Sequence, residues 1–255
     1  NDCRALYTVA YGNDIWVAVG ERIAWSSNGI DWTCTDIDGE KYQYAVAYGN
    51  GKFVSVGGGG IGNTVRHSTD GENWTVYDNV ANAYMGSNPA GDLIYANNIF
   101  VGASGSSNII YSTDGVNWSA TGQIITTDNN ARFVAIAYGG GKFVAMTNYG
   151  YSATSTDGIN WTQSSTTKLI GGSGGGSDAT AHYAGMTYGN NLFVFVGYYR
   201  NSPRTSYIWY SSDGASWQSK SIDFGTGCLG SETCNIGAVS GIAYGTLNIS
   251  EYPAP

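Results

Sequence analysis

One seven-residue motif recurs five times in this 255-residue chain and holds the side chains best suited to chemistry. Each copy begins with Ser, has Asp or Asn two residues later, continues with Gly and ends in Trp. Its polar and aromatic positions are Asn28, Asp70, Asp114, Asp157 and Asp213, and Trp32, Trp74, Trp118, Trp161 and Trp217. Carboxylate oxygens are the ligands that calcium prefers, so one reading of the motif is a set of cation or ligand sites.

The same side chains can instead stabilise a turn. An Asp or Asn side chain accepts hydrogen bonds from backbone N–H groups two residues further on. Because the whole motif returns in every repeat, we interpret it as five structural turn clamps and expect no bound metal. An Asp-Gly pair between strands also predicts a type I′ turn, in which both central residues have positive φ.

Catalytic groups outside the motif are sparse. The six arginines are scattered over different segments, and His67 and His182 belong to different repeats. Glycosidases need two carboxyl groups about 5 to 10 Å apart, and no motif indicates such a pair. No nucleophile elbow is present either. From the residues alone we expect that the chain is not an enzyme and uses no cofactor.

The spacing of the motif predicts the organisation of the chain. The five tryptophans are separated by 42, 44, 43 and 56 residues. Blades of a β-propeller typically take about 40 to 50 residues. Two further segments precede each motif. One is an apolar run through a Tyr, at 9–12, 46–49, 93–96, 136–139 and 186–189. The other is an aromatic residue followed by Val, at Trp16, Phe53, Phe100, Phe143 and Phe193.

These segments predict four strands in every repeat, because short apolar runs bounded by Gly and Asn are typical of hairpins. The fourth strand is expected to carry the Trp. The fold class is therefore all-β, a propeller of four-stranded antiparallel blades, most simply with five blades. One domain, 1–255, would contain repeats at 5–38, 42–79, 85–123, 131–167 and 181–222.

An extra strand is expected at 238–250, where Ile242-Ala243-Tyr244-Gly245 repeats the first-strand pattern. It could overlap the N-terminal strand of a five-bladed ring or begin an incomplete sixth blade. It could also pair with a neighbouring molecule, since an unpaired strand edge is a template for association.

The Ser-x-Asp-Gly-x-x-Trp motif resembles the Asp-box, or BNR, repeat of sialidase-like propellers. The longer run of Ala-Tyr-Gly-Asn-Gly-x-Phe-Val followed by Ser-Thr-Asp-Gly-x-Asn-Trp is similar to repeats of phage tail and fibre proteins and of bacterial secreted proteins. This resemblance covers roughly residues 7 to 245. It implies a protein displayed outside the cell, on a cell surface or on a virion.

The charge and the cysteine content indicate which classes of partner are excluded and which compartment is expected. The net charge is −8 with only 11 Lys and Arg, so nucleic acid and anionic membranes are poor partners. The four cysteines, Cys3, Cys34, Cys228 and Cys234, are expected to form disulfides in an oxidising compartment, and three pairings are possible. Asn73, Asn117, Asn160 and Asn248 fit the N-glycosylation pattern.

Recognition is expected in the loops between the second and third strands, because binding residues concentrate in loops on rigid scaffolds. These loops span 57–63, 104–108, 148–151 and 198–206. The last one and its flank supply the predicted ligand-binding residues Tyr198, Tyr199, Arg200, Arg204, Tyr207 and Trp209. Aromatic faces beside Arg suit sugars, so the expected partner is a glycan or another cell-surface ligand. The alternative is a subunit of a fibre or filament whose partner is another copy of the chain.

Overall fold

The computed structural model describes residues 3–35, 42–59, 62–78, 91–103, 105–126, 128–165, 169, 181–199 and 206–222. Every regular element within these ranges is a strand, twenty in all. Across the same ranges, no helix has the length and apolar character to cross a bilayer. Cys228, Cys234, Arg200, Arg204 and the expected strand at 238–250 lie outside the described residues.

The strands form five sheets of four, which we number as blades 1 to 5 in chain order. Blade 1 contains β1 (Leu6–Gly12), β2 (Ile15–Gly20), β3 (Ile23–Ser26) and β4 (Thr33–Thr35). Blade 2 contains β5 (Tyr42–Gly49), β6 (Lys52–Gly59), β7 (Gly62–Ser68) and β8 (Thr75–Asp78). Blade 3 contains β9 (Leu93–Ala96), β10 (Ile99–Ala103), β11 (Ile109–Ser112) and β12 (Ser119–Ala120). Blade 4 contains β13 (Phe133–Gly139), β14 (Lys142–Thr147), β15 (Ser152–Ser155) and β16 (Thr162–Gln163). Blade 5 contains β17 (Ala181–Gly189), β18 (Leu192–Tyr199), β19 (Ser206–Ser211) and β20 (Gln218–Ile222).

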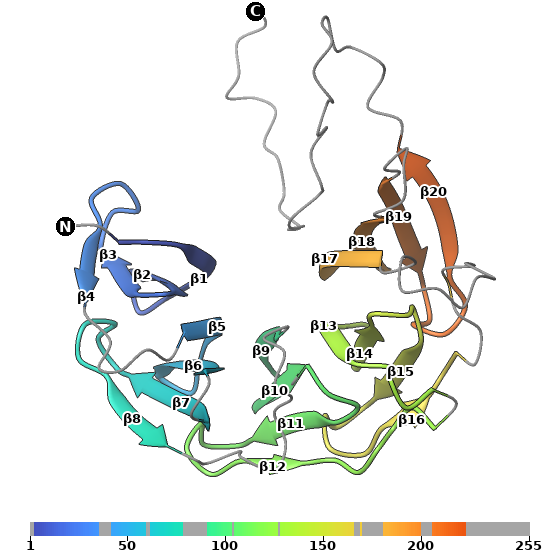
Figure 1. The fold of residues 1–255 in the computed structure, drawn as a ribbon, viewed down its shortest axis with the longest axis horizontal. Helices are drawn as coiled ribbons and strands as arrows, with labels where there is room; N and C mark the ends of the chain where they lie inside the picture. Colours follow the sequence, from blue (N-terminus) through green and yellow to red (C-terminus); the bar gives the residue numbers. More distant parts are fainter. Residues whose placement is uncertain are drawn as a thin grey trace, which may run out of the picture.

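Each blade is an antiparallel meander in which strands adjacent in sequence are adjacent in the sheet. Figure 1 shows the five blades side by side around an arc, with the first strand of each on the inside and the fourth on the outside. Blades 1 and 5 lie at the two ends of this arc. The prediction of five four-stranded antiparallel blades is confirmed.

The type I′ turns lie at a different hairpin from the one predicted. Between the first and second strands of blade 2, Asn50 and Gly51 have φ of 49° and 72°, and φ is also positive at the two equivalent residues of the other four blades. In the recurring motif only the Gly has positive φ, as at Gly115 with 76°. The prediction of a type I′ turn at Asp-Gly is therefore wrong, because side-chain hydrogen bonds close this turn instead. The Trp also precedes the fourth strand and does not belong to it.

The core lies between the blades and consists of contacts that repeat from one junction to the next. The aromatic residue of each second strand in blades 2 to 5 is at most 1% exposed, as at Phe53, Phe100, Phe143 and Phe193. First strands also interlock, because a Tyr of one blade lies against a Gly of the preceding blade. The pairs are Tyr48 on Gly12, Tyr95 on Gly49 and Tyr188 on Gly139. A side chain at these glycines would occupy the space of the Tyr ring.

Candidate functional site

The recurring motif forms a closed network of hydrogen bonds, seen clearly in blade 4. Ser155 Oγ accepts from the backbone N–H of Asp157 at 3.2 Å and of Gly158 at 2.9 Å, and donates to Asp157 Oδ1 at 2.9 Å. Asp157 Oδ1 also accepts from the N–H groups of Ile159 and Asn160 at 2.8 and 2.7 Å. Trp161 Nε1 donates to the Gly158 carbonyl at 2.9 Å. The acid is thus engaged in the turn itself.

Blade 1 builds the same turn with the acid and the amide exchanged. In blades 2 to 4 an Asn side chain donates to the motif's Asp, as Asn160 Nδ2 does to Asp157 Oδ2 at 2.8 Å. In blade 1 Asn28 Nδ2 donates to Asp31 Oδ2 at 2.8 Å, and Asn28 Oδ1 accepts the two backbone N–H groups. The turn therefore needs an acceptor oxygen and a complementary partner, not a negative charge at one position.

Hydrogen bonding lowers the pKa of the motif acids. For Asp157 the backbone N–H and side chain of Asn160 are the main causes, and together with the other hydrogen bonds of the turn they outweigh the opposing effect of burial. For Asp114 burial is the largest single effect and raises the pKa, but the hydrogen bonds from Asn117, Val116 and Ser112 together hold it well below the usual range. Hydrogen bonds also hold the pKa of Asp70 and Asp213 well below that range. These acids are charged at neutral pH, and their oxygens face backbone donors within the turn.

The motifs lie at separate blade junctions. Each motif Gly from blade 2 onward packs on a Val of the preceding blade, as Gly71 does on Val17 and Gly158 on Val101. Among the described residues, no group of three or more His, Cys, Asp or Glu side chains gathers in a metal-binding arrangement. The geometry supports turn stabilisation at each motif and brings none of the five together.

The predicted surface at 198–209 is only partly described. Tyr198 and Tyr199 lie at the end of β18, and their side chains are outside the described atoms, as are Arg200 and Arg204. Tyr207 is half-buried and stacks on Trp209, with ring centroids 5.6 Å apart.

The prediction that Trp209 binds a ligand is wrong, because Trp209 is a core residue and not a surface one. It is 2% exposed and packs against Phe195 at a centroid distance of 5.6 Å. The same place in the third strand is buried in every other blade, at Ala24, Arg66, Ile110 and Ala153. Trp209 fills the junction with blade 4, so its ring has no free face for a ligand.

A cluster of tyrosines on blades 1 and 2 forms an exposed aromatic surface among the described residues. The rings of Tyr7 and Tyr44 stack with centroids 5.8 Å apart and planes 12° apart. Tyr42 meets Tyr44 edge-on, at 6.5 Å and 88°. Tyr7 is 48% exposed, Tyr42 is 37% exposed and Tyr44 is half-buried. The three rings form one continuous surface at the start of the inner strands β1 and β5, which are neighbours in Figure 1.

A repeated β-bulge explains why Tyr7 and Tyr44 stack. The register of the first two strands shifts between Leu6 and Thr8 in blade 1 and between Gln43 and Ala45 in blade 2. Tyr7 and Tyr44 are the bulged residues, and a bulge changes the direction of its side chain. Blades 4 and 5 have the same bulge with Val134 and Ala184 in place of Tyr. The aromatic pair is therefore a local feature of blades 1 and 2, whereas the bulge recurs in blades 1, 2, 4 and 5.

Glu21 adds negative charge to this tyrosine cluster. Its backbone N–H donates to the Ala5 carbonyl at 2.8 Å, which holds the turn after β2 beside the start of β1. Partial burial, then Glu21, then Tyr42 raise the pKa of Tyr7. Partial burial followed by Tyr7 and Tyr42 raises the pKa of Tyr44. The cluster thus combines neutral aromatic faces and hydroxyl groups with a carboxylate.

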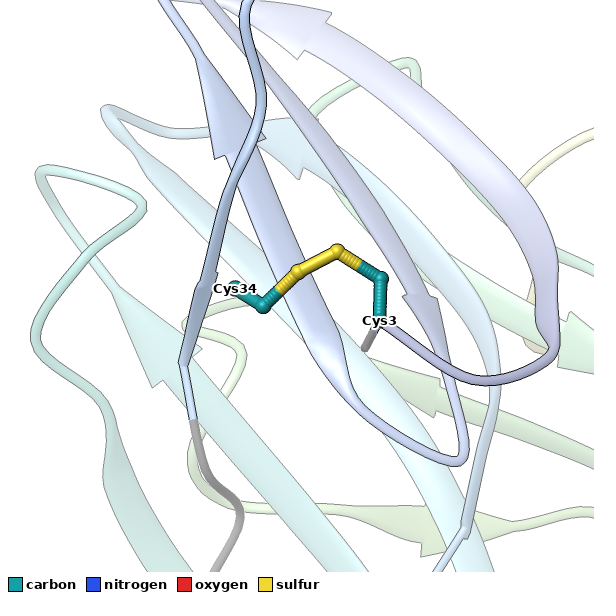
Figure 2. The surroundings of a disulfide bond; sticks show 2 residues. All are labelled: Cys3 and Cys34. Carbon is teal, nitrogen blue, oxygen red and sulfur yellow. A yellow bond between two sulfur atoms is a disulfide. The ribbon is translucent and has the colours of Figure 1, made fainter. Parts of the chain in front are cut away.

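A disulfide anchors the strand that carries Tyr7. Cys3 and Cys34 are bonded, with Cα atoms 5.5 Å apart, and Figure 2 shows the bond joining the chain before β1 to β4. Of the three possible pairings, the structure selects the one in which Cys3 joins Cys34. The bond ties the inner and outer strands of blade 1 together close to the cluster.

Sequence reasoning missed the tyrosine cluster, although a signal was present. Tyr7 and Tyr44 each lie two residues before the Val of the recurring Val-Ala-Tyr-Gly segment. Comparing that column across the repeats would have singled out blades 1 and 2.

No family model and no curated protein matches this chain. Among solved structures it is similar to a streptogramin B lyase, with a TM-score of 0.63 and 12% identity over 86% of this chain and 70% of that one. It is also similar to YCF48 bound to a D1 peptide, with a TM-score of 0.55 and 13% identity over 85% of this chain and 66% of that one. A nidogen/laminin complex matches with a TM-score of 0.55 and 10% identity over 87% of this chain and 80% of that one.

These structures are β-propellers. The chain folds as a β-propeller. At such identities the similarity shows the fold alone. The chain spans about two thirds of the first structures it matches.

The comparisons also correct the prediction that the chain is not an enzyme. A lyase is among the structures with this fold, so a propeller without a recognised catalytic motif gives no ground for that exclusion. The similarity does not extend to a reaction or a substrate for this chain.

Proposed function

We propose that this protein is a binding module, displayed outside the cell or on a virion, that recognises carbohydrate through the tyrosine cluster of Tyr7, Tyr42 and Tyr44. The observation that carries the proposal is the parallel stack of Tyr7 and Tyr44, two exposed or half-buried rings held in place by equivalent bulges. Rigid aromatic side chains supply a large contact area at low entropic cost.

The chemistry of the cluster suits a sugar. The faces of the rings can pack against the C–H groups of a pyranose, while the Tyr hydroxyls donate and accept hydrogen bonds. The carboxylate of Glu21 accepts hydrogen bonds from sugar hydroxyls. The net charge of −8 on the chain disfavours acidic sugars, so neutral glycans are the expected class.

Two observations support the proposed setting. The Cys3–Cys34 disulfide is typical of an oxidising compartment. The Ser–Asp–Trp hydrogen-bond network supports assignment of the motif to the Asp-box type, and the resemblance to fibre and secreted-protein repeats suggests external display.

A glycan array with purified protein tests the proposal. Wild-type protein should bind a set of neutral glycans, and Tyr7→Ala and Tyr44→Ala should lose that binding while keeping the wild-type circular dichroism spectrum. Tyr77→Ala is the matched control, because Tyr77 is a half-buried tyrosine on the outer strand of blade 2. Equal binding by all four proteins would contradict the proposal.

A peptide array is the second probe, because two of the similar propellers are described with a peptide or a protein partner. If peptides bind through Tyr7 and Tyr44 and glycans do not, the tyrosine cluster remains the binding site and the assignment to carbohydrate fails.

The alternative function is a fibre or filament subunit. One observation favours it: the apolar side of blade 1 that faces away from blade 2 is exposed. If another copy covered that side, light scattering would show a mass that rises with concentration. A monomer mass that stays constant with concentration would instead favour the binding module.

A further inference from the structure

The side of blade 1 that faces away from blade 2 is apolar and uncovered. Val9 is 52% exposed, Tyr11 is 53% exposed and Trp16 is 37% exposed. At the equivalent places in blade 2, Val46 is 5% exposed and Phe53 is fully buried. Blade 1 therefore presents to solvent the surface that the other blades bury at a junction.

The internal junctions show what this surface normally contacts. In blades 2, 3 and 5 the first-strand Tyr lies against a Gly at the end of the preceding first strand, and Tyr48 on Gly12 is one such pair. Tyr11 is the Tyr of this column in blade 1, and it is the first of the series. What Tyr11 lacks among the described residues is a glycine beneath its ring.

Blade 5 has the complementary feature, a first-strand glycine that no described Tyr covers. Gly12, Gly49 and Gly139 are buried under a Tyr of the next blade, whereas Gly189 is partly exposed. Val194 is also partly exposed, although Val17, Val54, Val101 and Val144 in the same column are fully buried. Each of those four valines lies under the motif Gly of the following blade. Among the described residues, therefore, no following strand places a Tyr on Gly189 and no motif Gly covers Val194.

We propose that residues 240–249 form a strand that lies between blades 5 and 1, with Tyr244 against Gly189 and Gly245 beneath Tyr11. This segment reads Ser-Gly-Ile-Ala-Tyr-Gly-Thr-Leu-Asn-Ile and lies outside the described residues. It repeats the first-strand pattern and has the Tyr and the Gly at adjacent positions. Among the described residues, Gly189 has no Tyr against it and Tyr11 has no Gly beneath it.

Connector length and charge agree with this placement. Residues 223–239 separate β20 from the segment, and 164–180 separate β16 from β17, so both connectors contain 17 residues. A connector of that length already carries the chain from the outer strand of one blade to the inner strand of the next. Residues 235–250 contain no charged side chain, which suits a contact with an apolar surface. The strand would join residues 1–255 into a single domain.

Photo-crosslinking of the full chain tests the proposal. Tyr11 is replaced by p-benzoylphenylalanine, and the products are separated by size and mapped by mass spectrometry over a range of concentrations. We expect an intrachain product joining position 11 to 240–249 at every concentration. The same replacement at Ile159, which is exposed on the motif of blade 4, is the control and should not reach that segment.

Two further variants identify the contact. Gly245→Val, introduced into the protein with p-benzoylphenylalanine at position 11, should lose most of the intrachain product. A side chain at 245 would occupy the space in which the ring at position 11 packs. Thr246→Val adds a similar side chain one residue later, in the expected turn, and should retain the product. Crosslinks between two chains would assign the surface to a second copy and overturn the proposal. Crosslinks only to other segments, or none in a protein with the wild-type circular dichroism spectrum, would overturn it as well.

Discussion

Val54 of blade 2 and Gly115 of blade 3 meet across a blade junction with no room for a side chain: a Cβ on Gly115 would lie 2.7 Å from Val54 Cγ2. Gly115 also has a φ of 76°, which L-residues other than Gly seldom adopt. One glycine thus satisfies both the turn and the packing between blades.

Gly115→Ala should lower the free energy of unfolding by about 3 kcal/mol, because left-handed backbone strain adds to overpacking at the junction. Gly51→Ala is the matched control, since Gly51 has a φ of 72° but no atom within 4 Å of the added Cβ. That variant should lose about 1 kcal/mol. Urea denaturation measures both, and equal losses would show that the contact with Val54 contributes nothing.

Exchanging the acid and the amide in blade 4 should be tolerated. Asp157→Ala removes the acceptor of two backbone N–H groups and should cost about 1 to 2 kcal/mol, as the loss of a helix N-cap does. The double variant Asp157→Asn with Asn160→Asp recreates the pair that blade 1 already uses, Asn28 with Asp31. It should restore most of the lost stability in urea denaturation. Failure to restore it would mean that the negative charge at position 157 is required.

The motif acids should make the fold sensitive to acid. Their folded pKa lies below the unfolded value of about 4, so their stabilisation is complete above that value. It is lost as pH falls below about 4 toward the folded pKa. Thermal unfolding from pH 6 to pH 2 should show a falling midpoint. Asp157→Asn should make the midpoint fall less steeply with decreasing pH, because it removes one carboxyl group with a lowered pKa. An unchanged dependence of the midpoint on pH would mean that other groups cause the acid sensitivity.

Asp92 should have the opposite pH dependence. The carboxyl group is enclosed although the residue keeps some exposure, and burial raises its pKa to about 6 despite hydrogen bonds from the backbone N–H groups of Ile136 and Leu93. Because the folded pKa exceeds the unfolded value, Asp92 favours the fold below about pH 4 and destabilises it as pH rises to about 6. Asp92→Asn should therefore raise stability at pH 7 more than at pH 4 in urea denaturation. An equal change at both pH values would contradict the raised pKa.

The Cys3–Cys34 bond should stabilise blade 1. Its sequence separation of 31 residues corresponds to a loop whose closure contributes at most about 4 kcal/mol. The double variant Cys3→Ser with Cys34→Ser should lower the free energy of unfolding by up to about 4 kcal/mol. It should also speed amide hydrogen exchange in β1 and β4. Because β1 carries Tyr7, the same variant should weaken ligand binding. Unchanged exchange in both strands would show that the bond does not hold them together.

Local patterns were enough to predict the blades. The spacing of Trp32, Trp74, Trp118, Trp161 and Trp217 predicted five repeats, and short apolar runs bounded by Gly and Asn predicted four strands in each. These features follow from short-range rules of strand periodicity and turn chemistry, which depend on neighbours in the chain. The same rules misplaced the type I′ turn, because Ser155 and Asp157 compete with the backbone for its hydrogen bonds.

Only the tertiary structure decided which aromatic residues are free. Trp209 and Tyr7 both lie in aromatic-rich strands, yet one is buried between blades 4 and 5 and the other is exposed beside Tyr44. Exposure depends on what the neighbouring blade places opposite a residue, and that neighbour is some 40 residues distant along the chain. For the same reason, the stack of Tyr7 on Tyr44 required the blades to be set side by side before it could be seen.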